Sequence, residues 1–293
     1  MSATATLTDP GGELEATFLP QLGMVLSSFR HQGEELLAQR GGPEAYAARG
    51  STFAIPLLHP WANRLAAWSY ERSGHHVDLD PALVHRDPDT GLPIHGVLAA
   101  SPYWHVLEQT PGSLTSELDF GAHPEYLAAF PFPHRLRYAA VLDGADLTVN
   151  LTVRPTSDLA VPISFGFHPY LTLPGSDRRD WVITLPVGER SVLEAQQLPT
   201  GAAEPLAHGA LDGVLGERTF DDSFERLIGD APAFSVADAS RRVELTFAAG
   251  YPVGQVFAPP GSGFVCFEPM TAPVNALVSG RGLRSARPGT EFT

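Results

Sequence analysis

The stretch RLRYAAVLDGADLTVNLTVR, residues 135–154, decides the fold class because apolar and polar residues alternate on either side of a short turn. In its second half, leucine or valine occupies every odd position from 147 to 153, and polar residues occupy the even positions from 148 to 154. This alternation is typical of a half-buried β-strand. The DGAD segment between the two runs indicates a tight turn in which Gly144 supplies a positive φ, so we predict an antiparallel hairpin.

Similar short runs recur along the chain and predict further strands at 13–19, 24–30, 51–58, 104–109, 114–120, 162–168, 181–185, 243–247, 255–258 and 264–268. Helical periodicity is scarce and is confined to EELLAQR at 34–40 and HPEYLAAF at 123–130. The 28 glycines and 27 prolines are spread between the runs as turn residues. Many short strands must bury their apolar faces against another sheet. We therefore predict an all-β fold, a large antiparallel β-sandwich with few short helices, formed by residues 1–293 as one domain.

The composition limits the classes of partner. Hydrophobic residues make up 43% of the chain and charged residues 18%, which is enough apolar material for a sizeable core. Lys and Arg total 19 against 33 Asp and Glu, a net charge of −14. Such a surface repels phosphate backbones, so we expect no nucleic-acid partner, and the charge argues weakly against an anionic substrate.

Localisation and redox state follow from three further observations. The first residues, MSATATLTDP, lack the basic and apolar regions of a secretory signal. The longest apolar runs, such as FAIPLL at 53–58, are far shorter than the roughly 18 residues of a membrane span. The single cysteine, Cys266, excludes an intramolecular disulfide. These features predict a cytoplasmic protein without a membrane partner, and they leave its oligomeric state open.

Several catalytic signatures do not occur in the sequence. It contains no G-x-S-x-G elbow, Walker loop, G-x-G-x-x-G, H-E-x-x-H or C-x-x-C. An H-x-H followed by a glutamate, as in a metal-dependent cupin isomerase, does not occur either. Serine-nucleophile, NTPase and dinucleotide functions therefore lose support, and we predict no metal site.

Five segments instead place polar residues at the ends of apolar or aromatic runs, where a strand delivers a side chain to the rim or concave face of a sheet: HPWANRLA (59–66), GLPIHG (91–96), SFGFHPYL (164–171), FDDSF (220–224) and FVCFEPM (264–270). In the last segment, Glu268 follows a predicted strand interior. Burying even a neutral polar group without a partner costs on the order of 2–7 kcal/mol, and an ion costs more. Glu268 is therefore either one partner of a structural salt bridge or a catalytic acid or base.

His168 taken alone resembles an ordinary strand-end histidine. Its neighbours Phe167 and Tyr170 add aromatic surface, and Pro169 forces His168 into an extended conformation. This setting resembles the floor of a sugar-binding site, with Tyr170 and Trp61 as candidate stacking surfaces.

The other candidates also have ordinary structural roles. Asn63 and Arg64 offer hydrogen-bond donors to hydroxyl oxygens, although Arg64 is equally consistent with a surface cation. His95 precedes a glycine that makes a turn, and Asp221 is as consistent with a turn or cap as with a ligand. Gln255 lies inside a predicted strand, where a cross-strand hydrogen bond is the commonest use of a glutamine.

Taken in this order, the ANR, IHG, aromatic-strand histidine, FDDSF and Glu-Pro segments resemble the aldose 1-epimerase (galactose mutarotase) family over roughly residues 10–285. The resemblance implies a galactose mutarotase-like supersandwich. It also implies roles for individual residues. Glu268 is then the catalytic base and His168 the catalytic acid. The residues that bind sugar hydroxyls are then Asn63, Arg64, His95, Asp221 and Gln255. The segments IHGV and FHPYL depart from the L-H-G-G and N-H-x-Y-F of well-known members, so we expect different pocket walls.

The implied reaction matches these residue types. A base removes the proton of the C1 hydroxyl while an acid protonates the ring oxygen, and the opened sugar recloses with the other configuration at C1. The reaction requires no cofactor, and its partner is a monosaccharide, an aldohexose. Two alternatives remain open: a hexose-6-phosphate 1-epimerase, which needs additional cations near C6, and a non-catalytic carbohydrate-binding protein, which has no use for an acid–base pair.

Overall fold

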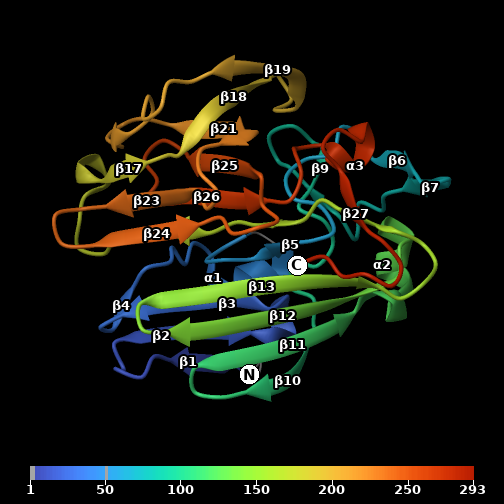
Figure 1. Ribbon diagram of the computed structural model, residues 1–293, viewed down its shortest axis with the longest axis horizontal. Coiled ribbons are helices and arrows are strands. Elements are labelled where there is room, and N and C mark those ends of the chain that lie inside the picture. Colours follow the sequence, from blue (N-terminus) through green and yellow to red (C-terminus); the bar gives the residue numbers. More distant parts are fainter. Residues whose placement is uncertain (1–3, 50–51) are drawn as a thin grey trace.

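The computed structural model describes residues 4–49 and 52–293, and it consists mostly of strands. Each pairing between two strands that the structure describes is antiparallel. Figure 1 shows the N-terminal and green strands in the lower half of the view and the orange C-terminal strands in the upper half. The fold class predicted from the alternation, an antiparallel β-sandwich with few short helices, is confirmed.

Two four-stranded sheets form the lower half of Figure 1. The first contains β1 (Ala5–Thr8), β2 (Leu14–Leu19), β3 (Val25–His31) and β4 (Glu34–Glu35). The second contains β10 (His105–Gln109), β11 (Ser113–Asp119), β12 (His134–Asp143) and β13 (Asp146–Pro155).

A six-stranded sheet, called the site sheet below, has the order β21-β25-β26-β15-β5, and β16 also pairs with β26. Its strands are β21 (Phe220–Phe224), β25 (Val253–Ala258), β26 (Val265–Met270), β15 (Gly166–Phe167), β5 (Leu57–Leu58) and β16 (Tyr170–Leu171). Two smaller sheets accompany it, made of β20 (Gly213–Val214), β17 (Val182–Thr184), β23 (Ala233–Ala237) and β24 (Arg242–Thr246), and of β19 (Pro199–Pro205), β18 (Val187–Leu193) and β22 (Arg226–Leu227).

The remaining elements are short. Paired strands are β14 (Val161–Ile163) with β27 (Arg284–Ala286), β6 (Ser69–Arg72) with β7 (His75–Asp78), and β8 (His85–Arg86) with β9 (Pro93–Ile94). The helices are α1 (Gly42–Arg49), α2 (Pro124–Ala129) and α3 (Ala276–Ser279), with 3-10 turns η1 (Pro20–Leu22), η2 (Phe120–Ala122) and η3 (Arg178–Asp180). No helix among the described residues is long and apolar enough to cross a lipid bilayer.

The hairpin predicted within residues 135–154 forms. Strands β12 and β13 pair from His134 opposite Pro155 to Asp143 opposite Asp146, and Gly144 in the turn has φ +56°. The predicted helix at 123–130 is also confirmed, as α2. The other predicted strands form with shifted ends, except that 162–168 divides into β14 and β15.

Two predictions were wrong. Residues 34–40 do not form a helix, because the Glu35 carboxylate accepts the backbone N–H groups of Phe29 and Leu37 and ties the segment to β3 as β4. The predicted strand 51–58 is reduced to β5, since Ala54 has φ +52° and interrupts extended pairing; residue 51 lies outside the described residues. Helix α1 and several strands, among them β1, β18, β19 and β23, were not predicted.

One core cluster of buried apolar side chains includes residues from Ala5 to Ala286 and draws on every large sheet. A second, smaller cluster around Leu58 and Met270 lies next to the site sheet. Because the main cluster is contributed by strands throughout the chain, we propose that residues 1–293 form one domain.

Candidate active site

Three predicted site residues lie on one face of the site sheet. The register of β25 and β26 places Gln255 directly opposite Glu268, and Ser223 of β21 is opposite Gln255. Side chains two residues apart on a strand share a face, so Asp221 projects to the same side. The amide nitrogen of Gln255 donates to Asp221 Oδ1 at 2.7 Å. Strands β21, β25 and β26 are neighbours in the sheet (Figure 1). They thus deliver a carboxylate, an amide and a second carboxylate to one surface.

His168 reaches this surface from the turn between β15 and β16. Its backbone N–H donates to the Pro56 carbonyl at 3.2 Å, and the next strand residue, Tyr170, pairs with Cys266 of β26. The imidazole Nε2 then lies 3.3 Å from Glu268 Oε1, and the two side chains are only 7% and 2% exposed. Residues that are 100 positions apart in the sequence therefore form a buried contact.

Two loops complete the cluster. Arg64 forms a β-bridge with Ile94, and the backbone N–H of His95 donates to the Asn63 carbonyl at 3.1 Å. Asn63 and His95 both have positive φ, +58° and +64°, which turns the chain sharply at both positions. The His95 ring packs edge-to-face on His168, with centroids 5.5 Å apart.

Arg64 connects these loops to the site sheet. Its Nε donates to Asp87 Oδ2 at 2.5 Å, its Nη2 lies 3.8 Å from Asp221 Oδ2, and its Nη1 donates to Asn63 Oδ1 at 3.3 Å. The structure therefore brings together Glu268, His168, Asn63, Arg64, His95, Asp221 and Gln255.

Burial controls the protonation states of the central pair. Desolvation raises the pKa of Glu268 well above its ordinary value; Asp221 raises it further and Arg64 opposes the rise. Desolvation lowers the pKa of His168 well below its ordinary value, with added contributions from His95 and Arg40. Both shifts favour the uncharged forms. The burial that causes the shift of the His168 pKa was not visible from the sequence.

His95 is also uncharged. Desolvation, followed by the nearby Arg64, lowers its pKa to about 3. A neutral imidazole carries one N–H donor and one nitrogen acceptor, and it suits hydrogen bonding to a hydroxyl group.

Several buried polar atoms in this cluster have no hydrogen-bond partner within residues 4–49 and 52–293: Glu268 Oε2, His168 Nδ1, His95 Nδ1, Gln255 Oε1 and Ser223 Oγ. Buried polar groups are normally satisfied, so such a concentration at one place indicates a polar ligand. Ser223 was missed at the sequence level, although its two-residue spacing from Asp221 could have indicated a shared face.

Tyr170 does not present an open stacking surface as predicted. It is 2% exposed, its ring stacks on His168 with centroids 4.4 Å apart, and its hydroxyl bonds to Arg40 and Thr52. Trp61 is 1% exposed and belongs to the main core cluster. Both aromatic side chains therefore support the site from within the protein.

Three further residues that contact the cluster were not predicted: Asp87, Arg40 and Thr52. Asp87 lies in a DPDTG turn, which explains the aspartate locally without reference to Arg64. No local pattern links Arg40 or Thr52 to a tyrosine more than 100 positions away. Among the described residues, no group of three or more His, Cys, Asp or Glu side chains is arranged to hold a metal ion.

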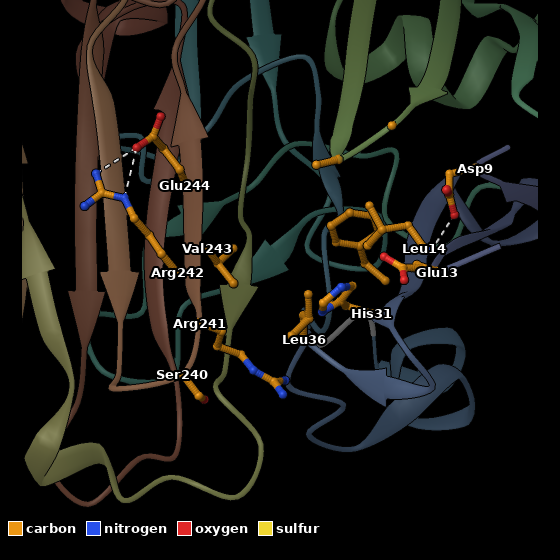
Figure 2. Close-up of a pocket in the computed structure, with 13 residues that line it drawn as sticks. Asp9, Glu13, Leu14, His31, Leu36, Ser240, Arg241, Arg242, Val243 and Glu244 are labelled. Carbon is orange, nitrogen blue, oxygen red and sulfur yellow. Dashed lines mark hydrogen bonds and ion pairs between the residues drawn. The ribbon is translucent and has the colours of Figure 1, made fainter. Parts of the chain in front are cut away.

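A separate cavity of about 520 Å³ lies between the first sheet and β24 (Figure 2). Among its charged groups, Asp9 accepts the Leu14 N–H at 2.6 Å and Arg242 pairs with Glu244 at 2.7 Å, whereas the buried Nε and Nη1 of Arg241 have no hydrogen-bond partner among the described residues. It shares no residue with the Glu268–His168 cluster and has no comparable acid–base contact.

Comparisons with known proteins agree with this architecture. A galactose mutarotase-like protein from Clostridium acetobutylicum superposes with a TM-score of 0.82 at 17% identity, covering 96% of this chain and 90% of that one. A galactose 1-epimerase from Lactobacillus acidophilus NCFM superposes with a TM-score of 0.74 at 16% identity, covering 98% and 90%. These similarities define the class: a galactose mutarotase-like β-sandwich.

The sequence itself specifies the family. The uncharacterised protein YihR of Escherichia coli K12 is 26% identical over 201 residues, which are 67% of this chain and 59% of that protein; the match thus spans less than two thirds of YihR. The family model of aldose 1-epimerases matches residues 4–293. The chain belongs to the aldose 1-epimerase family.

Proposed function

We propose that this protein is a cofactor-independent aldose 1-epimerase that interconverts the α and β anomers of a free aldohexose. The observation that carries the proposal is the 3.3 Å contact between Glu268 and His168, surrounded by buried polar atoms without protein partners. Anomer exchange needs one group to accept a proton and one to donate it, on two oxygens bonded to the same carbon. A close carboxyl–imidazole pair meets this need.

The uncharged pair is one proton transfer away from the reactive state. If the proton of the Glu268 carboxyl moves to His168 Nε2, the result is a carboxylate base and an imidazolium acid in contact. Glu268 then takes the C1 hydroxyl proton, His168 gives its proton to the ring oxygen, and the C1–O5 bond opens to the aldehyde. Rotation about C1–C2 and the reverse transfers close the ring on the other face, so no proton is gained or lost over the cycle.

The other residues fit hydroxyl binding. Asp221 and Gln255 share a face with Glu268 and offer acceptors, while Arg64 and the neutral His95 offer donors. Arg64 also limits the pKa rise of Glu268, which keeps the carboxylate accessible.

A free sugar is favoured over a sugar phosphate by the charges at the site. Arg64 already contacts the carboxylates of Asp87 and Asp221, so its positive charge is offset before any ligand binds. A dianionic phosphate placed beside these carboxylates would be repelled. A binding protein without activity is disfavoured because sugar recognition alone gives no use for the buried Glu268–His168 contact.

The test is the rate of anomer exchange of freshly dissolved α-D-glucose and α-D-galactose, measured by polarimetry or exchange NMR. We expect Glu268→Gln and His168→Asn each to reduce kcat/KM by about 10²–10⁴-fold. Glu244→Gln, on the exposed β24, is the matched control and should retain the wild-type rate. Glucose 6-phosphate assayed in parallel should be the poorer substrate.

Exchange by the wild-type protein no faster than in buffer, for every common aldose, would contradict the activity. Unchanged rates in both variants would contradict the assignment of Glu268 and His168. Faster turnover of glucose 6-phosphate would favour the phosphate epimerase instead.

A further inference from the structure

Behind the candidate acid, Tyr170 makes two different contacts with the same imidazole. Its ring lies parallel to the His168 ring, with centroids 4.4 Å apart and an interplanar angle of 6°. Its hydroxyl lies 3.3 Å from His168 Nε2, the nitrogen that also faces Glu268. The ring thus fixes the plane of the imidazole, and the hydroxyl lies next to its reactive edge.

Arg40 also contacts Tyr170. Its Nη1 lies 2.8 Å from the Tyr170 hydroxyl and 2.7 Å from the Thr52 carbonyl, and its Cζ lies 4.8 Å from the Tyr170 ring centroid. The Thr52 hydroxyl is 2.5 Å from the Tyr170 hydroxyl.

Donor and acceptor rules restrict the hydrogen positions in this group. A guanidinium only donates, so the Tyr170 oxygen accepts from Arg40. The hydrogen of Tyr170 then points either to Thr52 Oγ1 or to His168 Nε2. In both arrangements a hydroxyl polarised by a cation lies beside the imidazole nitrogen that exchanges a proton with Glu268.

The backbone holds these groups in place. Ala38 N–H donates to the Tyr170 carbonyl at 2.9 Å, Tyr170 N–H donates to Ala54 at 2.8 Å, and Ala54 N–H donates to Ala38 at 3.2 Å. The segments that carry Arg40 and Thr52 are therefore tied to β16 on both sides of helix α1. Backbone hydrogen bonds thus hold three chain segments together at this contact.

We propose that Arg40 and Tyr170 are a positioning pair that holds the His168 imidazole against Glu268 and keeps it uncharged between turnovers. The inference rests on the proposed epimerase function and adds two residues to its machinery. Tyr170 supplies the stacking surface and the hydroxyl, and Arg40 supplies a positive charge that opposes a second cation nearby. An imidazole that stayed charged would hold the proton needed by the resting Glu268 carboxyl and would leave a buried ion pair between turnovers.

The charge on His168 depends on groups from every segment around it. Glu268 faces it from β26, His95 from the loop after β9, Tyr170 from β16, and Arg40 from the segment before α1. Burial is the largest cause of the low pKa of His168, followed by His95 and then Arg40. Removing the charge of Arg40 should therefore raise the pKa of His168 while leaving its burial in place.

The experiment compares Arg40→Met, Arg40→Lys and Tyr170→Phe with the wild type. The control is Arg284→Met, because Arg284 also lies 4.8 Å from an aromatic centroid, that of Phe292, but contacts none of the site residues. The first readout is the ¹³Cε1 shift of His168 against pH in the free protein. The second is the pH profile of kcat/KM.

We expect Arg40→Met to move the protonation of His168 and the acidic limb of kcat/KM to higher pH and to reduce kcat/KM at neutral pH by about tenfold. Arg40→Lys should restore the titration towards the wild type by returning the charge. Tyr170→Phe keeps the stacked ring and removes the hydroxyl, so kcat should fall while KM changes little. Arg284→Met should match the wild type in both readouts.

The proposal is overturned if His168 titrates identically in Arg40→Met, Arg284→Met and the wild type, or if Tyr170→Phe retains full kcat. If Arg40→Met does not fold, Arg40→Lys and Tyr170→Phe decide by the same criteria. The NMR titration needs no turnover, so a wild-type protein without epimerase activity would contradict the proposed function and still test the role of Arg40.

Discussion

Arg64 is held in place by one buried carboxylate while its other donors face the candidate site. Its guanidinium is held at Nε by Asp87, which also accepts the Thr90 hydroxyl at 2.6 Å. Asp87 is buried; burial raises its pKa, but the hydrogen bonds from Thr90 and Arg64 outweigh this effect and lower it overall. Asp87 therefore stays ionised and fixes the direction in which Arg64 presents its remaining donors.

Asp87→Asn should weaken this orientation without altering the size of the side chain. Loss of the buried charge lets Arg64 shift toward Asp221, and we expect kcat/KM for the preferred aldose to fall about tenfold and unfolding to become easier by roughly 3 kcal/mol, as for a broken buried pair. Exchange NMR and urea denaturation measure the two effects. Asp89→Asn, an exposed residue of the same turn, is the control. Equal behaviour of the two variants would show that Asp87 has no positioning role.

The residue types at the site were predictable because each stands at the end of an apolar run, where its polarity is conspicuous. The supporting groups were not predictable for the opposite reason. Asp87 has a sufficient local explanation in its turn, and Arg40 reaches Tyr170 only because backbone pairing brings residues 38 and 54 to β16. Contacts of this kind depend on tertiary structure and leave no periodic signal.

At the scale of elements, the same distinction applies. The hairpin β12–β13 was predictable because its alternation and its turn agree with each other. Residues 34–40 have helix-forming composition, but the backbone hydrogen bonds to Glu35 and burial of Leu36 and Leu37 prevail over propensity. Helix α1 was missed because Tyr46 is its single large buried side chain among those described, which gives no helical stripe.

Beside β5 and β12, two buried histidines share one hydrogen bond. His59 Nε2 lies 2.9 Å from His134 Nε2, and His134 Nδ1 lies 2.6 Å from the Phe132 carbonyl. Because the carbonyl only accepts, His134 carries its hydrogen on Nδ1, its Nε2 accepts, and His59 Nε2 donates. Both rings are therefore neutral tautomers, packed against Phe120 and Phe130.

This pair should make the protein sensitive to acid. Burial, together with its neighbour His134, lowers the pKa of His59 well below the usual value, and burial lowers that of His134 to about 4. A histidine of the unfolded chain has a pKa of about 6.5, so below this pH the unfolded chain binds protons that the buried pair in the folded chain does not bind. The free energy of unfolding therefore falls as pH drops from about 6.5 toward 4. Glu268, with its raised pKa, contributes the opposite slope above its unfolded value.

Variants can separate the contribution of His59 and His134 to the pH dependence of stability from that of the other titrating groups. In the double variant His59→Leu/His134→Leu, we expect the slope of the unfolding free energy between pH 6.5 and 4 to decrease by up to about 1.4 kcal/mol per pH unit for each histidine removed. Urea denaturation at a series of pH values measures the slope. The exposed His208→Gln should leave it unchanged. An unaltered slope in the double variant would mean that the pair is protonated in the folded protein.

At the scale of the whole molecule, the net charge of −14 distinguishes neutral from anionic substrates. The field extends about 30 Å at 0.01 M salt and about 10 Å at 0.1 M. We expect kcat/KM for a hexuronate or hexose phosphate to rise with added salt, while that for a neutral aldose stays constant. Initial rates over this range of ionic strength provide the measurement. If the rate for glucose 6-phosphate fell with salt, a local cationic pocket would outweigh the overall charge.

The position of Glu268 on β26 has a consequence for biosynthesis. Because His168 precedes Glu268 by 100 positions in the sequence, a growing polypeptide contains the imidazole long before it contains the carboxyl group. Translation proceeds from the N-terminus at about 5–20 residues per second, so the loops around His95 and His168 emerge from the ribosome several seconds before their counterpart. We therefore expect the contact between residues 268 and 168 to form only after the strand carrying residue 268 has left the exit tunnel and inserted beside β25.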